Sequence, residues 1–229
     1  MKFYYDYIED YDIDFEEVVS PCSKKKPQWW KDMSFYLRGF NTVKDYWSSL
    51  TQQQKLQAEA FTTVKACPGF RDLFANAYLI KFPCDILVET TADGGFTWKV
   101  PSSQEILKLV SHNSEQMVSH IDKFVFKFEL PFLMAGDAQL IFMDPTYYKE
   151  QPYQVCPGVV KLHSNTRGLG LNVLTFFDKR DATYHFKKDE PMAMLYFPTS
   201  CKVRHRPLQK FVKKQFILEY GKKYSGVLE

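Results

Sequence analysis

The segment from Val64 to Val100 constrains the fold most, because it contains the clearest turn in the sequence. Residues 91–95, TADGG, combine an Asp-Gly and a Gly-Gly pair. Glycine adopts the positive φ angles of tight hairpin turns at little steric cost. After the turn, Phe96 and Trp98 alternate with polar residues, as in a strand with one buried face. The segment therefore predicts a β-hairpin, preceded by a short helix at 69–76.

The rest of the chain alternates short apolar runs with turn residues, which favours a β fold. Aromatic residues, which are frequent in strands, make up 17% of the chain. Further strands are expected at 58–64, 78–82, 86–91, 124–130, 138–143, 155–163, 171–177 and 192–197, with 203–206 as an extension of the last. Helices are expected at 41–57 and, from a Ser102–Glu105 capping box, at 102–110. We predict a mainly-β fold, with a single sandwich or jelly-roll-like body and a few short helices.

The two ends of the chain differ in charge from each other and from the middle. Residues 1–20 mix aromatic and acidic side chains, which fits either an edge strand on the body or an arm that docks on a neighbouring subunit. From Pro207 onward, apolar residues at helical spacing face lysines, which predicts a C-terminal amphipathic helix. We expect an acidic-aromatic arm and linker (1–27), a β-rich body (28–206) and a basic C-terminal helix or tail (207–229).

Candidate interaction residues follow from these features. Adjacent tryptophans bury a large area and usually anchor one segment onto another, although a platform for a carbohydrate or a base is an alternative. The basic tail could meet a polyanion, or the acidic arm of the same or another subunit. The residues expected to take part in interactions are Trp29, Trp30, Tyr4, Tyr5, Lys213 and Lys214.

The overall charge and the cysteines exclude several classes of protein. The net charge of +3 is small, whereas nucleic-acid binders usually show a concentrated basic footprint, so nucleic acid is not expected as a partner. The five cysteines are odd in number and widely spaced, which indicates a reducing compartment rather than a disulfide framework or a zinc site. No secretory signal or membrane span is expected, because no basic start leads into an apolar run and no apolar run reaches ~18 residues.

The sequence gives no catalytic constellation. It lacks a Gly-x-Ser-x-Gly elbow and the phosphate-binding glycine motifs. Cys67 precedes an expected helix start, where a thiol pKa can fall, but no base can be named for it. His185 and His205 lie in strand-like sequence and could meet as metal ligands. We nonetheless expect no catalytic residue, no metal and no cofactor.

Two resemblances add to this interpretation. The segments CPGFRD, AYLI and CDI resemble an uncharacterised β-rich family common in tailed bacteriophages and also found in some bacteria. In that family, a Cys-Pro-x-Phe-x-Asp segment leads into a hairpin, and later strands end in proline. The likeness covers roughly residues 64–200, and the matching segments are 67–72, 77–80, 84–86, 136–145 and 188–198. The chain departs from the family pattern at Ala77, where a glycine is expected. The resemblance implies a β-rich fold and a phage origin.

The second resemblance concerns residues 157–197. Their strand order looks like that of trimeric dUTPase and dCTP-deaminase folds. Those enzymes would need a carboxylate where this chain has Lys161 or Leu162, so their catalysis does not carry over.

Together these features predict a non-enzymatic phage protein, either a virion component or a protein-interaction factor, located in the virion or the host cytoplasm. Its partners would be other phage or host proteins, with self-association through the termini as a further option. The alternative is an enzyme on a β scaffold, either a metal-dependent oxygenase or a nucleotide hydrolase.

Overall fold

The computed structural model describes residues 1–8, 13–35, 42–57, 63–93, 95–100, 106–111, 123–162, 169–178 and 180–207. The strands are β1 (Lys2–Tyr7), β2 (Val19–Pro21), β3 (Ala77–Lys81), β4 (Ile86–Thr90), β5 (Phe96–Lys99), β6 (Lys108–Ser111), β7 (Lys123–Gly136), β8 (Gln139–Met143), β9 (Tyr153–Val155), β10 (Gly158–Lys161), β11 (Leu169–Asp178), β12 (Ala182–Phe186), β13 (Pro191–Tyr196) and β14 (Lys202–His205). The helices are α1 (Phe15–Val18), α2 (Gln28–Asp32), α3 (Val43–Ser49), α4 (Gln52–Leu56) and α5 (Pro68–Asn76), with one 3₁₀ turn, η2 (Val64–Ala66). The predicted mainly-β fold is confirmed.

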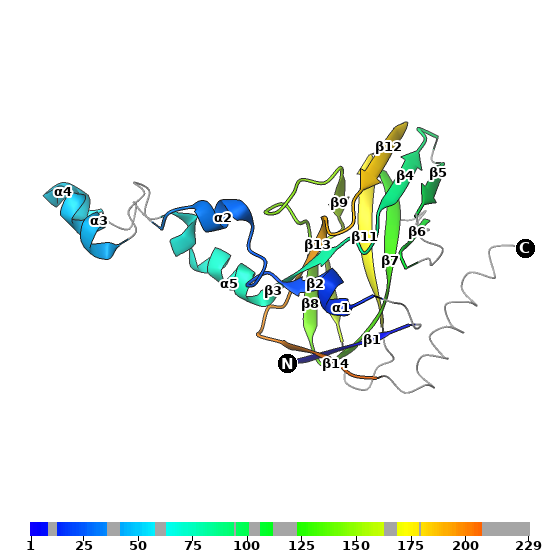
Figure 1. Ribbon diagram of the computed structural model, residues 1–229, viewed down its shortest axis with the longest axis horizontal. Helices are drawn as coiled ribbons and strands as arrows, with labels where there is room; N and C mark the ends of the chain where they lie inside the picture. The colour runs from blue at the N-terminus through cyan, green and yellow to red at the C-terminus, as the bar shows by residue number, and fades with distance from the viewer. Residues whose placement is uncertain are drawn as a thin grey trace, which may run out of the picture.

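Within the described residues, the strands form three sheets (Figure 1). The first has the order β14-β1-β7-β11-β9, the second β10-β8-β13-β3-β2 and the third β12-β4-β5. Strand β7 organises the first sheet, because β11 runs along one of its edges while β6 and β1 share the other. Pro131 lies within β7, and since proline has no N–H to donate, the register with β11 shifts near it, between Gly170 and Asn172.

Aromatic side chains hold the three sheets together. Phe128 of β7, Phe82 after β3 and Phe186 of β12 come from different sheets and are almost completely buried. The rings of Phe82 and Phe186 are stacked, with their centroids 4.9 Å apart. The Phe128 ring meets the Phe82 ring edge-on, with their centroids 5.5 Å apart. Such pairs add about 0.5–1.5 kcal/mol each beyond the area they bury. The sheets therefore share one core.

The hairpin predicted between β4 and β5 is confirmed. The backbone N–H of Thr91 donates to the carbonyl oxygen of Gly95 at 2.9 Å. A Cβ at Gly95 would lie 2.6 Å from the Thr91 hydroxyl oxygen, so any larger residue would have to displace that hydroxyl. Local turn chemistry was enough to place this element.

Three expectations about strands and helices are wrong. The helix expected at 102–110 is contradicted at its end, where Lys108–Ser111 form β6 and pair with β7. Residues 182–186, which are not among the expected strands, form β12 and pair with β4. Residues 202–205 do not extend β13: they form β14 in another sheet. In each case an unfilled sheet edge decides the conformation, which local pattern does not reveal.

Strand β1 lies inside the first sheet. It pairs with β14 in parallel on one side and with β7 antiparallel on the other. Residues 2–7 are therefore neither an arm nor an edge strand. The predicted C-terminal helix lies outside the described residues, apart from its first position. No helix of the described residues is long and apolar enough to cross a membrane.

A tight junction fixes the start of β1 to the end of β7. Gly136 has a φ of +136°, and a Cβ there would lie 2.2 Å from the carbonyl oxygen of Lys2. The same oxygen accepts a hydrogen bond from the backbone N–H of Asp137 at 3.1 Å. The Asp137 carboxylate accepts the backbone N–H of Lys2 at 2.6 Å. Gly136 is thus required both for its φ and for the close approach of the two strands.

Candidate interaction surface

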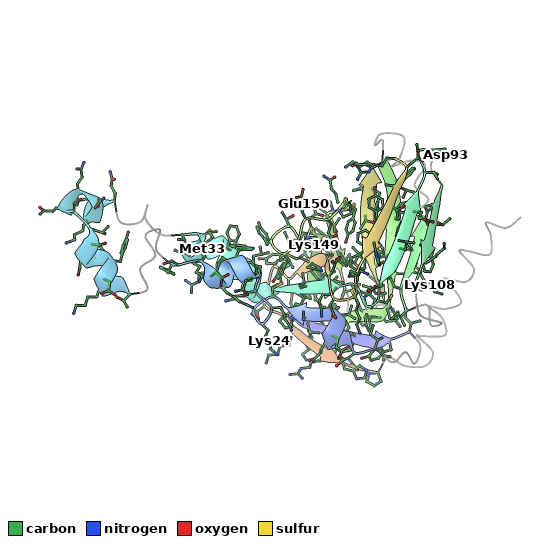
Figure 2. The ribbon with its side chains drawn as sticks, turned by 45° about the horizontal axis from the view of Figure 1, so that its top comes forward. Lys24, Met33, Asp93, Lys108, Lys149 and Glu150 are labelled. Carbon is green, nitrogen blue, oxygen red and sulfur yellow. The ribbon has the colours of Figure 1, made fainter. Side chains whose placement is uncertain are left out.

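A helical projection is the most distinctive surface feature. Helices α3 and α4, which form the projection (residues 42–57), stand clear of the three sheets in both views, to the left in each (Figures 1 and 2). The chain leaves and returns at one place: the backbone N–H of Thr63 donates to the carbonyl oxygen of Phe35 at 2.9 Å. The Thr63 hydroxyl also donates to the carbonyl oxygen of Ser34 at 2.7 Å.

The sequence forms two helices here because each has its own cap. The Thr42 hydroxyl accepts the backbone N–H of Asp45 at 3.1 Å at the start of α3. At α4, Thr51 and Gln54 form a capping box, in which the Gln54 side chain accepts the Thr51 N–H at 2.9 Å. Caps matter in helices this short, because each leaves several backbone groups unpaired at its ends. The Thr-x-x-Gln spacing could have revealed this division of the single helix expected at 41–57.

The projection presents apolar side chains to solvent. Leu56 is 87% exposed and Trp47 is 41% exposed, while Tyr46 and Leu50 are buried. A single exposed apolar residue is ordinary. A tryptophan and a leucine exposed on one small, capped unit away from the core are what a binding surface offers, since tryptophan is enriched among the residues that dominate interfaces. Sequence analysis missed both residues.

The base of the projection is built from aromatic rings. Trp30 is 6% exposed, and its ring packs against Phe70 and Phe74 of α5 with centroids 6.2 and 4.8 Å away. Trp29 is 37% exposed, and its indole N–H donates to the carbonyl oxygen of Tyr147 at 2.6 Å. Trp30 therefore occupies an anchoring position between α2 and α5, and Trp29 bridges to the segment after β8.

Helix α5 is in turn fixed to the second sheet. The hydroxyl of Tyr196 on β13 donates to the Asp72 carboxylate at 2.6 Å. Beneath the helix, burial raises the pKa of the Cys22 thiol to about 11 and raises that of Tyr148 further still. The base of the projection is thus a packed support that hydrogen bonds fix to the second sheet.

The other expected interaction residues lie elsewhere. Tyr5 is buried and stacks on Phe15 at 3.7 Å, and burial is the main reason that its pKa rises to about 12. Tyr4 is half-buried, with the guanidinium of Arg206 lying 5.2 Å from its ring centroid. Lys213 and Lys214 lie outside the described residues. The structure does not bring Tyr4 and Tyr5 to Trp29 and Trp30.

His185 and His205 do not meet. His185 is on β12 and His205 on β14, in different sheets at opposite ends of the body (Figure 1). Each has a carboxylate of its own: Nε2 of His185 is 3.7 Å from Asp85, and Nε2 of His205 is 3.4 Å from Asp6. In the part of the chain that the structure describes, no three His, Cys, Asp or Glu residues form a group that could hold a metal.

The sequence also contains a His-x-Asp spacing, His120 and Asp122, of the kind that non-haem iron sites use. The expectation that none of the five histidines occurs in this pattern is therefore wrong for His120. Both residues lie outside the described ranges, as do His112 and His163, so the structure does not test them.

Asp85 belongs to a structural clamp. The backbone N–H of Lys188 donates to its carboxylate at 2.8 Å, and the Lys187 ammonium lies 3.2 Å away, so the Asp85 pKa is lowered. Backbone bonds cross the same gap: the Asp189 N–H donates to the carbonyl oxygen of Phe82 at 2.9 Å, and the Phe82 N–H donates to the carbonyl oxygen of Glu190 at 3.0 Å. The clamp joins the β3–β4 and β12–β13 connections where both cross between sheets.

Four of the five cysteines have thiol pKa values above the usual one. All five are free. Burial raises the thiol pKa of Cys84 to about 11, and it also raises the pKa values of Cys156 and Cys201. A thiol needs a lowered pKa to react readily near neutral pH. Cys67 is exposed at the start of α5.

A small pocket lies between α1 and the β3–β4 connection. Val18, Phe82, Pro83 and Ile106 line it together with charged side chains, and its volume is about 80 Å³. Sites for small-molecule ligands usually enclose ~300–1,000 Å³. This pocket is too small for a nucleotide.

Comparison of the chain with family models, with curated proteins and with solved structures finds no match. The two resemblances drawn from the sequence therefore stay predictions.

Proposed function

We propose that this protein is a non-enzymatic phage protein that binds another phage or host protein through the projection, either as a virion component or as an interaction factor. The observation that carries the proposal is the exposure of Trp47 and Leu56 on a capped helical unit that stands away from the sheets. Burial of a leucine side chain contributes about 1.5–3 kcal/mol, which is a substantial share of a binding energy. The phage assignment rests on the sequence resemblance.

The support beneath the projection fits this role. Trp30 packs on α5, and Thr63 ties the two connecting segments together. A surface held in place loses less conformational entropy on binding than a flexible one. The body would then act as a rigid platform, in the virion or in the host cytoplasm.

Site-specific photo-crosslinking tests the proposal. A photoreactive phenylalanine analogue replaces Trp47 in the infected cell, and a matched protein carries it at Val159, which is 57% exposed on β10 of the body. We expect a crosslinked partner, identified by mass spectrometry, from position 47 and not from position 159. Leu56→Ala should weaken binding of that partner about 30-fold, as for an interface hot spot, without lowering the melting temperature.

Mass spectrometry of purified particles separates the two forms of the proposal. A virion component is present in stoichiometric amounts, whereas an interaction factor is found only in infected cells. Absence from the particles together with no specific crosslink at position 47 would refute the proposal.

A further inference from the structure

The pairing of β1 with β14 gathers positive charge from two distant parts of the chain. In this parallel pair, Lys2 lies opposite Lys202, and Tyr4 lies opposite Arg204. Paired residues project to the same side of a sheet, with neighbouring strands about 4.8 Å apart. The guanidinium of Arg206 lies over the Tyr4 ring, at 5.2 Å from its centroid. We call Lys2, Lys202, Arg204 and Arg206, with Tyr4, the basic stripe.

The four basic side chains of the stripe are exposed. Among the described residues, none of the four has a carboxylate within ion-pair distance. Lysines elsewhere on the body do have such partners: Lys81 pairs with Asp189 at 2.9 Å, and Lys149 pairs with Glu190 at 2.8 Å. Two carboxylates on or next to the strands of this sheet are already engaged, since Asp6 is buried beside His205 and Asp137 accepts the backbone N–H of Lys2.

Like charges directly opposite each other destabilise a sheet. The stripe places Lys2 opposite Lys202 without a neutralising partner from the described chain, so an external anion would relieve this repulsion. The chain continues from the stripe with further positive charge, because residues 208–229 contain five lysines and two glutamates.

We propose that the basic stripe binds the phosphate backbone of a nucleic acid. Arginine and lysine together with an aromatic ring are the groups that track such a backbone, since guanidinium groups bind phosphate in a bidentate manner. A sheet edge that exposes cations at intervals of two residues offers several phosphate contacts in a row. The small net charge of the whole chain had argued against nucleic acid, but the relevant quantity is the local concentration of charge that the β1–β14 pairing produces.

Fluorescence anisotropy with labelled oligonucleotides of about 16 residues tests the inference. The probes are single-stranded DNA, single-stranded RNA and duplex DNA, each titrated between about 50 and 200 mM salt. The variant is Lys202→Gln with Arg204→Gln. The control is Lys99→Gln with Lys161→Gln, which removes the same charge from exposed positions on β5 and β10.

We expect the full chain to bind at least one probe, with an affinity that falls as salt rises. Each phosphate contact contributes about 0.7 to the slope of log affinity against log salt for single strands, so the stripe variant should lose about 1.4 from the slope. Its affinity at the lowest salt should fall about tenfold. The control should bind as the natural chain does.

Three results would overturn the inference. The first is absence of binding to all three probes at the lowest salt. The second is an equal loss of affinity in the stripe variant and the control. The third is that polyglutamate competes as well as a nucleic acid of the same charge, which would assign the stripe to an acidic protein. Circular dichroism spectra of the variants, compared with the natural chain, establish that both are folded.

Discussion

Replacement of Gly136 by alanine should destabilise the protein strongly. The residue has a φ of +136°, which side chains with a Cβ rarely adopt, and such strain costs about 1–3 kcal/mol. The new Cβ would lie 2.2 Å from the carbonyl oxygen of Lys2, a backbone atom that cannot rotate away. Displacing that oxygen weakens its hydrogen bond from Asp137, at a further cost of about 1 kcal/mol.

These contributions sum to a loss of about 2–4 kcal/mol in the free energy of unfolding. Typical domains have only about 5–15 kcal/mol in total. Urea denaturation, followed by tryptophan fluorescence, measures the loss from the shift of the midpoint at constant slope. The same junction fixes β1 to β7, and β1 in turn pairs with β14, so Gly136→Ala should also weaken the binding of a ligand to the basic stripe.

Gly69→Ala is the matched control. This glycine lies in the first turn of α5, and the nearest atom to a new Cβ is the Cys67 sulfur at 3.9 Å, an ordinary contact. The alanine has a better helix propensity than glycine, so this variant should be unchanged or more stable by up to about 1 kcal/mol. If Gly136→Ala lost less than about 1 kcal/mol, the argument from the close strand approach would be wrong.

Three further outcomes are expected. Tyr153→Phe removes a buried hydroxyl that donates to the carbonyl oxygen of Met192 at 2.9 Å, and it should cost about 1–3 kcal/mol by the same urea assay. Alkylation of the folded protein at pH 8, read by peptide mass spectrometry, should modify exposed Cys67 first and spare Cys22, whose thiol pKa is raised to about 11; early modification of Cys22 would contradict its burial. The pKa of Asp85 is lowered in the folded state, so the ionised carboxylate stabilises the protein above its usual pKa of 3.8, and this contribution is lost as the pH falls below that value. Asp85→Asn should therefore make the free energy of unfolding fall less steeply at acid pH. An unchanged acid limb of the stability–pH curve would disprove this.

Sequence reasoning worked where the cause of a conformation is local. The 91–95 turn was placed because its glycines and its Asp-Gly pair decide the backbone by themselves. Helix α5 followed from a proline at its first position and apolar residues on one face. Neither required knowledge of the rest of the chain.

It failed where a distant partner decides. Ser102 and Glu105 suggested a helix running to Val110, but Lys108–Ser111 complete the free edge of β7 instead. The basic run around Arg204 can be recognised in the sequence, but its pairing with β1, which places Lys2 opposite Lys202, cannot. For the projection, the residues that cap the two helices can be recognised in the sequence. The exposure of Trp47 cannot be predicted in this way, because it depends on how far the helices stand from the body.

The parallel pairing of β1 with β14 also has a consequence for synthesis on the ribosome. Residues 2 and 202 are paired neighbours, yet at about 5–20 residues per second the second is made about 10–40 s after the first. Until then one edge of β1 has no paired strand, and its aromatic side chains cannot pack against all of their final neighbours. Closing so distant a contact also slows folding. The last step in maturation of the first sheet should therefore be the arrival of β14, and a nascent chain stalled before residue 202 should engage chaperones that recognise exposed aromatic strands.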